Sequence, residues 1–256
     1  MRPKFRRSVL IAVMASSLCA TSLSTQNAAA DQTPGTRPST AARMAAASGV
    51  PEGLLVAVNE RGKISRSLTG VVSDGDVEFA SLTKPAGATV RAAYLGTATT
   101  GFTEYQMTTP LRLADQDVPI TGEIPNGIYS YNYLADVTPL VKATLDAAGP
   151  GSVSVPYQEP VDAYYIDGSE LIVIWDDPNV TTDQSVTVLY GALKTSGDTY
   201  SVHLASPVHP AATDTKLEMS LGISYSYQSY GVQQYSQVDV NGQRMTTSKG
   251  GEDDGR

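Results

Sequence analysis

The sequence predicts an all-β fold: an antiparallel, jelly-roll-like β-sandwich with one short helix. From Val50 onward, short runs of β-branched and aromatic residues alternate with turn residues, as in a sandwich. Four Asx-Gly dipeptides supply residues that tolerate the positive φ angles of tight hairpin turns. They are Asp74-Gly75, Asn126-Gly127, Asp167-Gly168 and Asn241-Gly242.

One predicted strand stands out. Leu171–Trp175 is apolar on both faces, so we expect a central, fully buried strand. Asp167-Gly168 is expected to form a hairpin turn between this strand and Tyr164–Ile166. In chain order, the other predicted strands cover residues 54–58, 65–72, 77–82, 90–96, 153–156, 186–190, 200–204 and 216–227, followed by a hairpin of 238–240 with 243–245.

A single helix is expected to interrupt the strands. Thr138 is predicted to cap its start, and Pro139 suits the first helical position. Gly149 is expected to end it. The apolar stripe of the helix consists of Leu140, Val141, Thr144 and Leu145.

Residues 1–30 have the pattern of a secretion signal: a basic start, an apolar stretch over Val9–Leu23, and small residues at Ala28–Ala30. The single cysteine, Cys19, lies in this segment, so we expect a secreted, extracellular mature chain that has no thiol. Residues 31–48 are predicted to be a flexible leader, because their composition buries little apolar surface. Residues 49–256 are expected to form one β-sandwich domain.

The charge of the mature chain is strongly negative. The full sequence has net charge −8, and removal of the signal takes away four basic residues and no acids, which leaves −12. Such a chain repels phosphate backbones, so nucleic acid is not expected as a partner. No apolar run after residue 30 is long enough to span a membrane.

Several blocks of the sequence occur in an order that resembles a group of uncharacterised secreted proteins of actinomycetes. They include "NYLADVTPLV", "SELIVIWDDP" and "VDVNGQRMTTSKGGEDDG". The central part is also similar to a domain of unknown function in surface proteins of archaea and bacteria. The resemblance covers about Lys84 to Gly255 and implies a β-sandwich extracellular module, with no catalytic or binding residues to transfer. Members of the group continue beyond this stretch, so the resemblance implies a C-terminus truncated at Arg256.

Ser81 and Lys84 are the candidate catalytic residues. Their Ser-x-x-Lys spacing resembles that of penicillin-recognising serine hydrolases, in which the lysine on a helix activates the serine. Pro85 follows directly and favours a turn over a helix. On a strand, residues three apart point to opposite faces, which would separate the two groups. The hydrolase is therefore kept as an alternative, and the expected catalytic set is none.

Acidic residues after the buried strand are candidates for a calcium site. Asp176, Asp177 and Asp183 supply carboxylates in loops, which is the ligand type that calcium prefers. Their spacing matches no known calcium loop, and Asp-Asp-Pro is common turn chemistry. We therefore expect no cofactor and keep calcium as the alternative. His203 and His209 lack the partners that a zinc site needs.

Tyrosine is unusually frequent, with 14 tyrosines against three phenylalanines. Tyr225 and Tyr227 alternate with serines on a predicted strand, and Tyr230 follows. Aromatic faces beside hydroxyl groups suit sugars or protein surfaces, so these three are the candidate binding residues. Ordinary sandwich packing of tyrosines is the other interpretation.

The sequence thus favours a secreted, non-enzymatic binding module for an extracellular protein or polysaccharide. The alternatives are a secreted serine hydrolase that uses Ser81 and Lys84, and a structural component of the cell surface.

Overall fold

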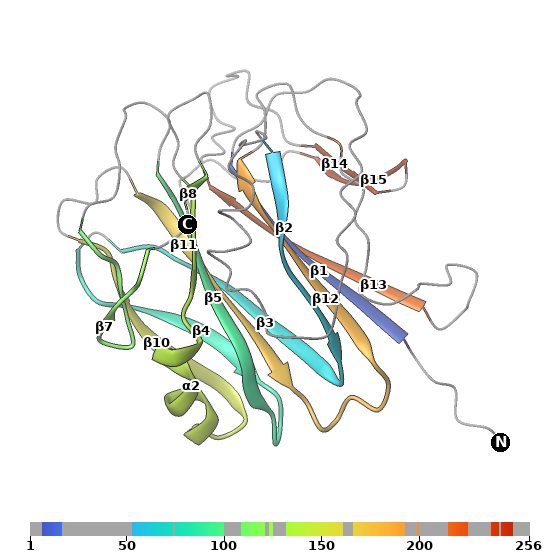
Figure 1. The fold of residues 1–256 in the computed structure, drawn as a ribbon, viewed down its shortest axis with the longest axis horizontal. Helices are drawn as coiled ribbons and strands as arrows, with labels where there is room; N and C mark the ends of the chain where they lie inside the picture. Colours follow the sequence, from blue (N-terminus) through green and yellow to red (C-terminus); the bar gives the residue numbers. More distant parts are fainter. Residues whose placement is uncertain are drawn as a thin grey trace, which may run out of the picture.

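The computed structural model of the 256-residue chain describes residues 7–16, 53–73, 75–99, 109–120, 123–124, 132–160, 166–192, 199, 215–224, 237–240 and 242–247 (Figure 1). The elements in chain order are β1 (Arg7–Ser16), β2 (Gly53–Gly62), β3 (Ile64–Val71), β4 (Glu78–Lys84), β5 (Thr89–Thr99), β6 (Arg112–Leu113), β7 (Gln116–Asp117), β8 (Glu123–Ile124), β9 (Asn132–Asp136), α2 (Thr138–Ala147), β10 (Gly151–Gln158), β11 (Ile166–Asp176), β12 (Gln184–Ala192), β13 (Thr215–Ser224), β14 (Gln237–Val240) and β15 (Gln243–Thr247).

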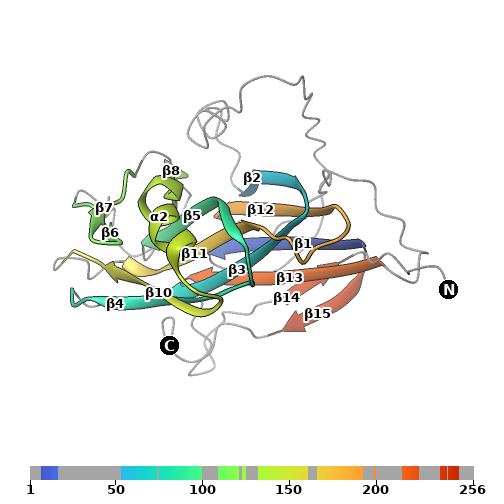
Figure 2. The same cartoon turned by 90° about the horizontal axis from the view of Figure 1, so that it is seen from below.

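Within these residues the strands form three larger sheets and a hairpin. Sheet A has the order β13-β1-β12-β2, sheet B the order β3-β11-β5-β9-β8, and sheet C the order β4-β10-β6-β7; β14 pairs with β15. Neighbouring strands are antiparallel, except that β1 runs parallel to both β12 and β13. Figure 2 shows the strands of sheet A one above another in this order. The predicted all-β sandwich with one short helix is confirmed for the described residues.

β11 is the centre of the molecule. It pairs with β3 on one side and β5 on the other, and Leu171–Trp175 are fully buried, which confirms the predicted central strand. Successive side chains of a strand point to opposite faces. Leu171, Val173 and Trp175 therefore pack with sheet C and α2. Ile172 and Ile174 pack with sheet A. Sheet B is thus the middle layer between two apolar cores.

Two predicted hairpin turns have other roles. Asp167-Gly168 does not end a strand, because Ile166–Asp176 is continuous and the dipeptide forms a β-bulge opposite β5. Gly168 supplies the positive φ of 79° that such a bulge uses. Gly75, with φ of 93°, joins β3 of sheet B to β4 of sheet C, so no hairpin forms there.

The other two Asx-Gly dipeptides have different outcomes. Gly242, with φ of 78°, lies between β14 and β15, and this predicted hairpin is confirmed. Asn126-Gly127 lies outside the described residues, as does the predicted strand 200–204.

The helix starts differently from the prediction. Val137, rather than Thr138, is its N-cap residue and makes no side-chain capping bond. The Thr138 N–H instead donates to Asp136 Oδ1 at 2.9 Å, and the Thr138 hydroxyl accepts a bond from the Ala93 N–H of β5 at 2.8 Å. Val141 and Leu145 are buried as expected, whereas Thr144 is exposed.

β1 lies within the predicted secretion signal. Its backbone pairs with β12 from Val9 to Ser16 and with β13 along its whole length. A chain cleaved after Ala30 would lack this strand. The predicted leader, residues 31–48, lies outside the described residues.

Candidate binding surface

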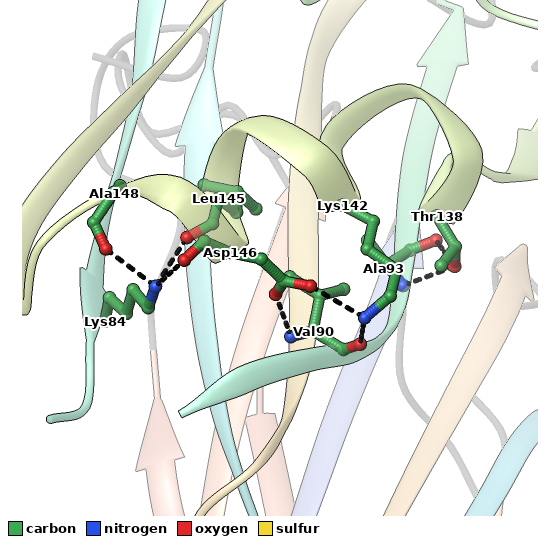
Figure 3. Close-up of polar contacts among 8 residues, drawn as sticks. All are labelled: Lys84, Val90, Ala93, Thr138, Lys142, Leu145, Asp146 and Ala148. Atoms are coloured by element: carbon green, nitrogen blue, oxygen red, sulfur yellow. Dashed lines mark hydrogen bonds and ion pairs between the residues drawn. The ribbon is translucent and has the colours of Figure 1, made fainter. Parts of the chain in front are cut away.

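The structure places Ser81 and Lys84 on opposite faces of β4. Ser81 is exposed, and its Oγ lies 3.0 Å from Ser154 Oγ on β10. Lys84 is buried, and its Nζ donates to the carbonyl oxygens of Leu145, Asp146 and Ala148 at 2.7, 2.8 and 2.7 Å (Figure 3). The two side chains are not brought together as a serine–lysine pair.

Lys84 instead holds the C-terminal end of α2. The last carbonyls of a helix lack partners within the helix and carry partial negative charge, so a buried ammonium stabilises them. This arrangement joins β4 of sheet C to the helix. The alternation of side chains along β4 predicts that Lys84 points to the face opposite Ser81. The sequence does not predict its hydrogen-bond partners, which lie more than 60 residues away in the chain.

The Lys142–Asp146 ion pair of the helix holds α2 on β5 through hydrogen bonds with Val90. Lys142 Nζ donates to Val90 O and to Asp146 Oδ2, and the Val90 N–H donates to Asp146 Oδ1 at 2.6 Å (Figure 3). Burial by itself raises the pKa of Asp146. The hydrogen bonds from Lys142 and Val90, together with the positive charges of Lys142 and Lys84, outweigh burial and hold that pKa below its usual value.

The three candidate calcium ligands have separate partners. Asp176 accepts bonds from the Arg91 guanidinium at 2.6–2.7 Å. Asp177 accepts from the backbone and side chain of Asn179, both at 2.9 Å, as in an Asx turn. Asp183 pairs with Arg61 at 3.3 Å. No group of three His, Cys, Asp or Glu residues suited to a metal occurs among the described residues.

The candidate tyrosines Tyr225, Tyr227 and Tyr230 lie outside the described residues, as do His203 and His209. The four tyrosines that the structure describes are buried. They are Tyr94, Tyr133, Tyr157 and Tyr190.

Tyr157 belongs to a buried polar network that sequence reasoning missed. Its hydroxyl donates to Glu159 Oε1 at 2.8 Å and lies 2.7 Å from Ser169 Oγ. Burial, followed by the negative charge of Glu159, raises the pKa of Tyr157 well above its ordinary value. The phenol of Tyr157 therefore stays protonated, donates a hydrogen bond, and is a poor base for Ser169. We infer that this network stabilises the fold.

The outer face of sheet C is the best candidate for a functional surface. Three cross-strand pairs of β4 and β10 share this face, and we call these six residues the hydroxyl face. They are Phe79 with Pro156, Ser81 with Ser154, and Thr83 with Ser152. The four serine and threonine residues are exposed. The opposite face, with Ala80, Leu82, Val153 and Val155, packs into the core.

Phe79 is the unusual member of the hydroxyl face. Its side chain is 58% exposed, and the nearby Val77 is 50% exposed. One face of an antiparallel sheet is commonly solvated, which explains the hydroxyl groups without any function. Ordinary solvation of a sheet face does not explain an exposed aromatic ring beside the hydroxyl groups. Neighbouring exposed apolar side chains are a feature of interaction sites. The six residues of the hydroxyl face include no ionisable side chain, and a hydroxyl can both donate and accept hydrogen bonds.

No protein-family model, curated protein or solved structure matches the chain. In the part of the chain that the structure describes, no helix is long and apolar enough to cross a membrane.

Proposed function

We propose that the protein is a secreted, non-enzymatic binding module whose hydroxyl face binds an uncharged extracellular glycan. The observation that carries this proposal is the exposed Phe79, which lies next to two cross-strand pairs that carry four exposed hydroxyl groups. An aromatic ring stacks on the apolar face of a sugar, and hydroxyl groups exchange hydrogen bonds with it.

The charge distribution of the protein supports the proposal that the ligand is uncharged. None of the six residues of the hydroxyl face is ionisable, and the expected mature chain has net charge −12. A polyanion would be repelled by that charge and would find no cation among these six residues. Export, expected from residues 1–30, places the module where such polysaccharides occur.

Retention on insoluble neutral polysaccharides tests the proposal. We expect Phe79→Ala to weaken retention roughly three- to tenfold, because an aromatic contact contributes about 0.5–1.5 kcal/mol. Met245→Ala is the matched control, since Met245 is 54% exposed on β15, away from the hydroxyl face. Equal retention of wild type and Phe79→Ala would contradict the proposal.

The same assay separates the other ligands. Loss of retention in Tyr225→Ala or Tyr227→Ala, with Phe79→Ala unaffected, would move the site to the predicted tyrosine platform. Capture of an extracellular protein that depends on Phe79 would make the ligand a protein. Covalent labelling by a fluorescent penicillin, lost in Ser81→Ala, would favour the hydrolase. Self-assembly or sedimentation with the cell envelope would favour a structural component.

A further inference from the structure

Glu170 is a partly buried acid at the interface between sheets A and B. It lies on β11 and, by the alternation of the strand, faces sheet A together with Ile172 and Ile174. Its cross-strand neighbours are both glycines, Gly70 on β3 and Gly96 on β5. No side chain therefore flanks Glu170 on either neighbouring strand.

The carboxyl group of Glu170 packs directly on β13. A Cβ atom built on Gly222 would overlap the Glu170 carboxyl group, so only a glycine at residue 222 leaves room for this contact. Glu170 Oε2 is buried and has no hydrogen-bond partner. A neutral carboxyl tolerates such a place far better than a carboxylate does. Burial accordingly raises the pKa of Glu170 to about 7.

The charged and titratable groups around Glu170 do not neutralise it. Tyr190 on β12 lies near it, and burial together with the charge of Glu170 raises the pKa of that phenol. Tyr94 lies on the same face of β5. Arg66 is on the same face of β3 but opposite Ile174, about 13 Å along the strand from the position of Glu170. Its electrostatic partner is Glu218 on β13.

We propose that a proton controls the contact between Glu170 and Gly222: with the carboxyl neutral, β13 packs on sheet B, and with the carboxylate charged, β13 separates from it. The Arg66–Glu218 attraction acts four residues earlier on β13. Separation would therefore start at the Gly222 end of the strand. Such a device makes the packing of β13 in the full-length chain, in which β1 is present, respond to pH.

The direction of the effect follows from the two pKa values. With β13 packed the pKa is about 7, and a hydrated glutamate has a pKa of about 4.5. Between these values the packed state holds a proton that the open state has released. Packing is therefore most favourable below pH 4.5 and weakens as the pH rises to 7. Between pH 5.5 and pH 8.5 we expect the opening equilibrium of β13 to rise roughly 30-fold.

Amide hydrogen exchange of the full-length chain tests this, with rates corrected for the intrinsic effect of pH. Protection of residues 215–224 should fall about 30-fold from pH 5.5 to pH 8.5 in wild type. Glu170→Gln keeps the shape without the charge, so its protection should change less than twofold. The matched control Glu78→Gln, an exposed acid on β4, should behave like wild type. Gly222→Ala should lose protection at both pH values, because the added methyl group displaces the carboxyl.

Two outcomes would overturn the proposal: equal protection of wild type at both pH values, or the same fall in Glu170→Gln as in wild type. If Glu170→Gln does not fold, the carboxyl carbon resonance of Glu170 in the wild-type chain decides instead. A titration midpoint near 7 supports the proposal, and a midpoint near 4.5 refutes it.

Discussion

Tyr157 holds two other polar side chains inside the core between sheets B and C. Its hydroxyl bonds to a carboxylate and lies within hydrogen-bond distance of a serine hydroxyl. The hydroxyl of the similarly buried Tyr190 has only neutral backbone partners: it donates to Thr97 O at 2.6 Å and also has a backbone hydrogen bond with Tyr133. The two tyrosines therefore offer a comparison in which the size and burial of the removed hydroxyl are the same and its partners differ.

We expect Tyr157→Phe to lower the free energy of unfolding by about 2–3 kcal/mol, and Tyr190→Phe to lower it by about 1 kcal/mol. The difference arises because a buried carboxylate loses a charge-assisted hydrogen bond in the first variant. Urea unfolding followed by the fluorescence of Trp175, the single tryptophan and a fully buried one, measures both values. Equal losses in the two variants would contradict this assignment.

The bulge in β11 makes one glycine necessary within a strand. Gly168 has φ of 79°, and an added Cβ would lie 3.3 Å from Val71 O of β3. Gly149, after α2, has no atom within 4 Å of an added Cβ and no positive φ. We expect Gly168→Ala to cost about 1–2 kcal/mol of stability and Gly149→Ala less than about 0.5 kcal/mol. Thermal unfolding of the two variants checks this, and a harmless Gly168→Ala would show that the bulge adapts.

The bulge also illustrates which elements can be predicted from the sequence and which cannot. The local sequence pattern predicts the strands at 54–58, 171–175 and 186–190, because a run of apolar residues can be recognised without knowing the partner strand. The sequence wrongly predicts a hairpin turn at Asp167-Gly168, because turns and bulges use the same positive φ. The distinction depends on what lies opposite, here residues 97–99 of β5, about 70 residues earlier.

The hydroxyl face cannot be predicted from the sequence either, because it depends on which strands pair. Ser81, Thr83, Ser152 and Ser154 each alternate with apolar residues in the sequence, and each strand by itself indicates only a solvated face. The register that places Ser81 opposite Ser154 comes from the fold. The sequence itself, by contrast, argues against the alternative of a Ser81–Lys84 catalytic pair. Side chains three residues apart on a strand point to opposite faces of the sheet.

Across the whole molecule, β11 joins two cores that we expect to unfold together. Leu171 packs in the core with sheet C, and its neighbour Ile172 packs in the core with sheet A. Both are fully buried, so Leu171→Ala and Ile172→Ala should each cost about 2–5 kcal/mol. Each should shift one cooperative transition, in which Trp175 fluorescence and far-ultraviolet circular dichroism coincide. An Ile172→Ala variant that leaves the Trp175 transition unchanged would show that the cores are independent.

The position of β11 late in the chain has a consequence for how the protein folds. Its pairing partners are β3 and β5, which leave the ribosome or a translocation channel well before it. Until Asp176 has emerged, both of those strands lack their common neighbour and neither core can close. Such non-local pairing makes folding slow. A chain made in this order can complete its two cores only after β11 has been synthesised.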